Sequence, residues 1–148
     1  MPQCYLLTGL AKLQGIKNYL TSLLENDIKI LIFAHHLAVM DEIEEHLKNI
    51  KLGYMRIDGS TSNDMRKKNV KNFEEDSNIH SALLSITAAS VGITLTAASN
   101  VVFAELHWTP ANLLQAEDRV HRIGQKSSVN IHYLIGENTL DHILLKQL

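Results

Sequence analysis

Short apolar runs alternate along the chain with longer stretches in which apolar residues recur every three or four positions. The short runs are rich in Ile, Val and Leu, which is typical of strands that are covered on both faces of a sheet. They predict five strands, over Ile28–Ala34, Gly53–Ile57, His80–Ile86, Ser99–Leu106 and Asn130–Ile135.

The longer stretches have the apolar spacing of amphipathic helices. Thr61 and Asp64 resemble a capping box, so we expect the third helix to begin there. Thr109 and Pro110 supply an N-cap and a first-turn proline for the fourth helix, and Gly124 follows it as a stop signal. The predicted helices are Leu10–Glu25, Leu37–Lys51, Thr61–Phe73, Thr109–Arg122 and a last one over 137–148.

Strands that alternate with helices of ordinary length predict right-handed crossovers and an α/β fold, a three-layer doubly wound parallel sheet. A length of 148 residues predicts a single domain. We expect residues 1–27 to form a helical lead-in and 137–148 to form a helix cut from a longer protein. Ligands of such sheets bind beyond the carboxyl ends of the strands, although fold class alone leaves function open.

Composition narrows the class of protein. A hydrophobic content of 45% supports a packed core, and a net charge of −2 argues against an obvious nucleic-acid binder, while saying nothing about local patches. The single cysteine, Cys4, forms no internal disulfide, and no apolar run approaches the roughly 20 residues that span a bilayer. The sequence therefore predicts a soluble intracellular domain.

Several familiar sites are absent from the sequence. It contains no G-x-x-x-x-G-K-[ST] loop, no G-x-G-x-x-G after a strand, and no G-x-S-x-G elbow. The eight histidines lack the spacing of metal ligands, so we expect scattered surface histidines and no metal site. The domain is therefore not expected to hold a triphosphate unaided.

One helix carries an arginine pair. Gln115, Arg119 and Arg122 stand at i, i+4 and i+7 on one face, and Asp118 can pair with Arg122. Arginines in a last turn stabilise a helix by about 0.3–1 kcal/mol, which is an ordinary explanation. Alternatively, two planar guanidinium groups can grip a transferred phosphoryl group, where an arginine finger accelerates the reaction by about 10³- to 10⁵-fold.

The stretch W-T-P-A-N-L-L-Q-A-E-D-R-V-H-R-I-G-Q, Trp108–Gln125, resembles motif VI of SWI/SNF-type ATP-dependent DNA translocases in helicase superfamily 2. Thr109, in place of asparagine, is the one departure. Three other stretches resemble further motifs of that family: Ile30–His36, Arg56–Thr61 and Leu83–Phe103. The short sequences F-A-H-H, F-A-E-L and S-V-N-I-H-Y-L are most similar to the HARP-like annealing-helicase subgroup.

The resemblance implies the second RecA-like lobe of a two-lobed motor, a P-loop NTPase-like fold without its own phosphate loop. ATP and Mg²⁺ would be held mainly by an N-terminal lobe of the same polypeptide, DNA would be a partner, and the protein would be nuclear. By resemblance, Arg119 and Arg122 are the catalytic finger positions. The implied nucleotide-binding residues are Gln115, Asp118, Gly92 and Thr94.

Other positions are candidates for DNA contact. Relatives often carry F-S-Q where this chain has Phe33-Ala34-His35, so the serine hydroxyl is absent and His35 would take over its contact with the DNA backbone. Ser85, Thr87, Ala88 and Ser90 offer small side chains and backbone N–H groups that suit sequence-independent tracking of a strand. An ordinary strand-end cap is the alternative for Ser85 and Thr87.

The basic run Arg66–Lys71 is either a solvated helix face or a further DNA contact. Two other functions stay open as well. One is a stand-alone, non-catalytic DNA-binding adaptor, which would show salt-sensitive DNA affinity on its own. The other is a doubly wound domain that binds a small nucleotide, for which the absent phosphate loop is unfavourable.

Overall fold

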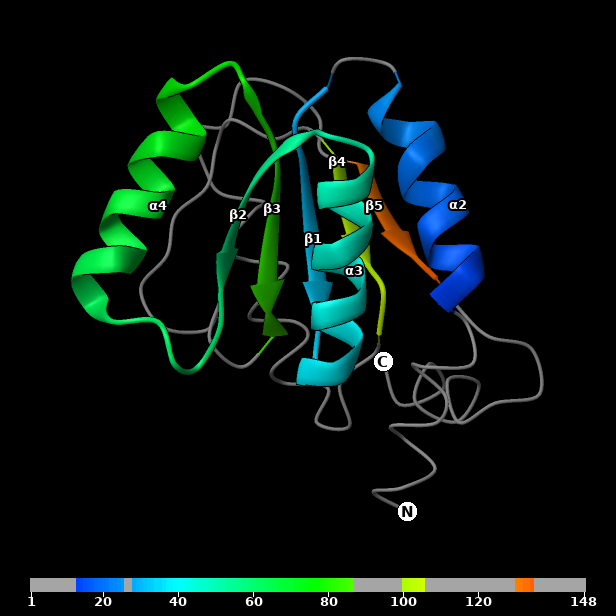
Figure 1. The fold of residues 1–148 in the computed structure, drawn as a ribbon, viewed down its shortest axis with the longest axis horizontal. Coiled ribbons are helices and arrows are strands. Elements are labelled where there is room, and N and C mark those ends of the chain that lie inside the picture. Colours follow the sequence, from blue (N-terminus) through cyan, green and yellow to red (C-terminus); the bar gives the residue numbers. More distant parts are fainter. Residues whose placement is uncertain (1–12, 26–27, 87–99, 106–129, 135–148) are drawn as a thin grey trace.

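The computed structural model describes residues 13–25, 28–86, 100–105 and 130–134. Within them a sheet of five strands has the order β2-β3-β1-β4-β5, and every neighbouring pair is parallel (Figure 1). The predicted parallel α/β sheet is therefore confirmed. The strands are β1 Ile30–Ala34, β2 Gly53–Ile57, β3 Ile79–Ser85, β4 Asn100–Phe103 and β5 Asn130–Tyr133.

Three helices flank this sheet in the described part of the chain: α2 Leu13–Leu24, α3 Leu37–Asn49 and α4 Asn63–Glu75. From β1 the chain passes through α3 to β2, on the far side of β3, and then returns through α4 to β3. The crossovers that contain α3 and α4 therefore run in opposite directions along the sheet. Right-handed crossovers then place α3 and α4 on opposite faces, with α2 beside α3 (Figure 1). This is the expected layered arrangement.

A continuous aliphatic core lies between the sheet and the helices α2 and α3. Its members come from alternate positions of the strands and from one face of each helix, as the periods of about two and 3.6 residues require. They are almost fully buried, and include Ile16, Leu20, Ile32, Ile43, Leu47, Leu83 and Val102.

On the opposite face, an aromatic row crosses three strands. The register pairs Phe33 with Phe103 and Phe103 with Tyr133. The rings of Phe33 and Phe103 stack 4.9 Å apart, and those of Phe103 and Tyr133 stack 5.0 Å apart. Such cross-strand pairs fix the register of β1, β4 and β5, because a slip of one residue would turn a ring to the other face.

The sequence prediction for the start of α4 was wrong by one residue. Ser62, not Thr61, is the N-cap, and its hydroxyl accepts a hydrogen bond from Met65 N at 3.3 Å. Thr61 is engaged elsewhere, since its Oγ1 accepts from Asp58 N at 3.0 Å. The turn that begins at Asp58 uses the threonine hydroxyl, so the next hydroxyl along the chain caps the helix.

Helix α3 ends with a residue in the left-handed region. Lys51 has φ 57°. The N–H of Leu52 donates to Leu47 O at 3.3 Å and that of Lys51 donates to Lys48 O at 3.1 Å, which is the hydrogen-bond pattern of a Schellman motif. A lysine therefore occupies a position where glycine is usual.

The helices expected over Thr109–Arg122 and over 137–148 lie outside the described residues. Residues 1–12 of the predicted lead-in also lie outside them. Among the helices of the described residues, none has both the length and the apolar character needed to cross a membrane.

Candidate functional site

Because all neighbouring strands are parallel, their carboxyl ends lie along one edge of the sheet (Figure 1). Ser85, the last residue of β3, pairs with Ala34, the last residue of β1, and His35 follows directly. On the other side of β1, Glu105 comes shortly after β4, and its carboxylate contacts the backbone of His35. Parallel α/β sheets bind their ligands at this edge, so it is the candidate functional site.

The carboxylate of Glu105 fills the turn between β1 and α3. Its Oε1 accepts from the backbone N–H of His35 at 3.0 Å and of His36 at 2.9 Å, and its Oε2 lies 2.6 Å from Nδ1 of His36. Only 1% of Glu105 is exposed. Because α3 has no acidic residue in its first turn and its N-cap side chain makes no capping bond, Glu105 supplies the negative charge that a helix N-terminus favours.

His35 and Ser85 are the predicted DNA-contact residues that the structure describes, and they lie together. His35 is half-buried, and its ring meets the ring of His36 edge-on, with centroids 4.8 Å apart. Ser85 is 4% exposed, so its hydroxyl is largely covered. The structure brings the two residues to the same edge of the sheet, and their contact with DNA stays a prediction.

A tight loop follows β2 at the same edge. Oδ1 of Asp58 accepts from the backbone N–H of Ser60 at 2.8 Å and from its hydroxyl at 2.5 Å. The N–H of Thr61 donates to Asp58 O at 3.1 Å and closes the turn. The hydrogen bonds from Ser60, together with the nearby Arg56 guanidinium, lower the pKa of Asp58. The loop therefore holds a carboxylate that stays ionised.

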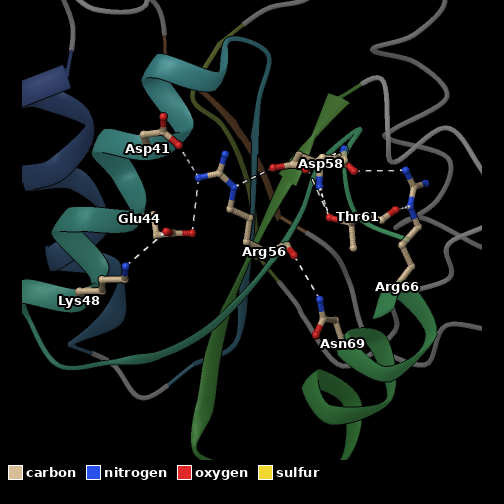
Figure 2. Close-up of polar contacts among 9 residues, drawn as sticks. Asp41, Glu44, Lys48, Arg56, Asp58, Thr61, Arg66 and Asn69 are labelled. Carbon is tan, nitrogen blue, oxygen red and sulfur yellow. Dashed lines mark hydrogen bonds and ion pairs between the residues drawn. The ribbon is translucent and has the colours of Figure 1, made fainter. Parts of the chain in front are cut away.

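Arg56 on β2 ties this loop to α3 (Figure 2). Its Nη1 donates to Asp41 at 2.7 Å and lies 3.5 Å from Glu44, while its Nε donates to Asp58 Oδ2 at 3.1 Å. Burial lowers the pKa of Arg56, but hydrogen bonds and charges from these three carboxylates outweigh it, and the pKa is raised. Lys48 contacts Glu44 at 3.5 Å and adds a second positive charge.

The basic run of α4 divides into two parts. Arg66 turns toward the loop, where Nε donates to Thr61 O at 3.1 Å and Nη2 to Asp58 O at 3.2 Å (Figure 2). Lys67, Lys68 and Lys71 are exposed. The arginine thus stabilises the Asp58–Thr61 loop, and contact of the lysines with DNA stays a prediction.

Sequence reasoning noticed the Arg56–Thr61 stretch only as a family resemblance, and it missed the role of Glu105. The one available signal for Glu105 was a carboxylate inside an apolar run, F-A-E-L, where a buried charge needs partners. Its partners are about 70 residues away along the chain, because the hydrogen bonds join positions separated by 69 and 70 residues.

The other predicted site residues lie outside the described residues. They are Arg119, Arg122, Gln115, Asp118, Gly92, Thr94, Thr87, Ala88 and Ser90. Within the described ranges, no three His, Cys, Asp or Glu side chains come close enough together to hold a metal ion.

Comparison with known families and structures gives consistent matches. Residues 11–124 match the helicase conserved C-terminal domain family. In a crystal structure of the C-terminal part of the Fun30 ATPase domain, a similar fold covers 90% of this chain and 43% of that one, with a TM-score of 0.82 and 32% identity.

Curated relatives are similar over most of the chain. The human DNA annealing helicase and endonuclease ZRANB3 is 51% identical over 138 residues, or 93% of this chain. A Caenorhabditis elegans homolog of the SWI/SNF-related matrix-associated actin-dependent regulator of chromatin subfamily A-like protein 1 is 49% identical over 147 residues, or 95% of this chain. The chain spans only 13% and 21% of these two proteins. It belongs to the helicase conserved C-terminal domain family, in which its relatives include the SWI/SNF-related annealing helicases.

Proposed function

We propose that this chain is the second motor lobe of an ATP-dependent, DNA-stimulated translocase of the annealing-helicase type. ATP and Mg²⁺ are held mainly by an N-terminal RecA-like lobe of the same polypeptide. The family match over residues 11–124 supports the lobe assignment. The observation that carries the division of labour is the Gln115–Arg119–Arg122 spacing in a sequence that has no phosphate loop.

In this proposal Arg119 and Arg122 complete a nucleotide site from across a cleft. Their guanidinium groups stay charged at any physiological pH and match the oxygens of a phosphoryl group. Positive charge at that point stabilises the transition state more than the ground state, which is how an arginine finger raises the rate. Gln115, Asp118, Gly92 and Thr94 would border the nucleotide.

The carboxyl edge of the sheet would contact the DNA backbone. His35 can donate a ring N–H to a phosphate, and Thr87, Ala88 and Ser90 offer hydroxyl and backbone donors. Ser85, whose hydroxyl is largely covered, would lie beside them at the end of β3. Contacts of this kind read no sequence, as a translocase requires. The relatives are described as a DNA annealing helicase and as a regulator of chromatin, which supports DNA as the partner and a nuclear location.

The decisive experiment uses the polypeptide that carries this chain together with its N-terminal lobe. We expect Arg122→Ala to reduce DNA-stimulated ATP hydrolysis by about 10³-fold or more, while ATP binding changes little. Arg122→Lys keeps the charge but loses the planar fork, so it should restore only a small part of the rate. Lys48→Ala, which removes an exposed positive charge on α3 outside the proposed nucleotide and DNA contacts, is the matched control.

Near-normal turnover of Arg122→Ala would refute the finger assignment. Tight ATP binding by the 148-residue chain alone would instead favour a self-sufficient nucleotide site. Salt-dependent DNA binding by the chain with no hydrolysis in the two-lobed protein would favour a DNA-binding adaptor.

A further inference from the structure

Glu105 links two segments that lie far apart in the sequence. It follows β4, and it binds the turn between β1 and α3 through both carboxylate oxygens. At 1% exposure it is one of four buried polar or charged residues in the described part of the chain. A carboxylate removed from water is unfavourable unless hydrogen bonds replace its hydration, and here three donors do so.

These hydrogen bonds determine the position of His35 in two ways. Oε1 accepts from its backbone N–H at 3.0 Å, which fixes the chain where β1 ends. Oε2 holds Nδ1 of His36 at 2.6 Å, so the His36 ring is fixed, and the His35 ring packs against it at an interplanar angle of 80°. Both the backbone and the imidazole of His35 therefore depend on one carboxylate.

We propose that Glu105 is a positioning residue for DNA binding: it holds the His35 imidazole in the orientation that meets a DNA phosphate. This inference rests on the proposed function, because it takes His35 to be a DNA contact. A preset imidazole loses little rotational freedom when the phosphate arrives, so the held ring binds more tightly than a free one. Glu105 itself is covered and makes no contact with DNA.

A double-mutant cycle in the two-lobed protein tests the proposal. The variants are Glu105→Gln, His35→Ala and their combination, and the readout is ATP hydrolysis as a function of DNA concentration. We expect His35→Ala to raise the half-saturating DNA concentration about tenfold and Glu105→Gln about fivefold, with the rate at saturating DNA within about twofold of the parent. The combined variant should be no weaker than His35→Ala, because the carboxylate acts through that ring.

Glu42→Gln is the matched control. It makes the same chemical change on α3, at a half-exposed residue paired with Lys17, and should leave the half-saturating DNA concentration unchanged. If Glu105→Gln does not fold, His36→Asn replaces it in the cycle. That change keeps the carboxylate and its two backbone donors, and it removes the His36 ring together with its bond to Oε2 and its contact with the His35 ring. The same non-additivity with His35→Ala is expected.

Three outcomes are informative. Multiplying effects, about fiftyfold in the combined variant, would show that Glu105 acts independently of His35 and overturn the inference. If His35→Ala raises the half-saturating DNA concentration and Glu105→Gln leaves it unchanged, the inference is also overturned, while His35 remains a DNA contact. A silent His35→Ala would remove that contact from the proposed function itself.

Discussion

Nε of Arg56 donates to Oδ2 of Asp58 across 3.1 Å, and this bond joins the β2 strand to the loop that leaves it (Figure 2). The two residues are two positions apart in the sequence, so an extended strand would direct their side chains to the same face. Here the arginine also spans to α3 through Asp41 at 2.7 Å. The pair thereby anchors the Asp58–Thr61 loop to a helix.

The first prediction concerns the acid sensitivity of this loop. The folded-state pKa of Asp58 is lowered from its ordinary value of 3.8, so its stabilising contribution is present above that value. It is lost as the pH falls through the lowered pKa, since the folded state must then take up a proton. Asp58→Asn should lose about 1.5–3 kcal/mol at pH 7, and its difference from the parent should shrink as the pH falls below 3.8.

Urea unfolding of the parent and of Asp58→Asn between pH 2 and pH 7 measures this difference. Asp64→Asn, at an exposed residue in the first turn of α4, is the control. A constant difference between parent and Asp58→Asn across that range would contradict the prediction.

A second pH dependence comes from His46 on α3. Burial and the positive charge of Lys17 lower its pKa from 6.5, and the Thr21 hydroxyl lies 2.8 Å from its Nε2. The unfolded chain then binds more protons just below pH 6.5, so stability falls as the pH drops from 6.5 through the lowered pKa. His46→Gln should flatten that part of the stability profile, as thermal unfolding at a series of pH values would show. An unchanged slope would exclude His46 as its source.

The end of α3 offers a stabilising substitution. Lys51 has φ 57°, a conformation that is unfavourable for side chains with a Cβ and favourable for glycine. Lys51→Gly should stabilise the domain by about 0.5–1 kcal/mol. Glu45→Gly, in the interior of the same helix, should destabilise it by about 0.8–1 kcal/mol. Chemical denaturation of both variants measures whether the two changes in stability have opposite signs. A loss of stability in both variants would contradict the left-handed conformation of Lys51.

Two glycines should respond oppositely to alanine. A Cβ on Gly53 would lie 2.1 Å from the backbone oxygen of Asn78, at the point where the pairing of β2 with β3 shifts. Gly53→Ala should therefore cost several kcal/mol, since backbone must move. A Cβ on Gly15 meets nothing within 4 Å, so Gly15→Ala in α2 should add about 0.5–1 kcal/mol. Melting temperatures distinguish the two, and a stable Gly53→Ala would contradict the close approach.

The sequence by itself determined the strands, the helices α2 to α4 and the parallel class of the sheet. Those features follow from local periodicity, which residues such as Ile32, Ile43 and Leu47 express whatever lies far along the chain. Strand ends moved by one to three residues because hydrogen bonding, not hydrophobicity, decides where pairing stops. Ser62 replaced Thr61 as the cap because the Asp58 turn already used the threonine hydroxyl.

Only the tertiary structure decided which polar residues meet. The order β2-β3-β1-β4-β5 puts the end of β4 beside the end of β1, and so delivers the Glu105 carboxylate to the backbone of His35. No local pattern encodes that meeting, because it depends on how strands distant in the chain are ordered and aligned. An acidic residue inside an apolar run indicates a buried carboxylate that needs hydrogen-bond donors, but only the fold determines which donors contact it.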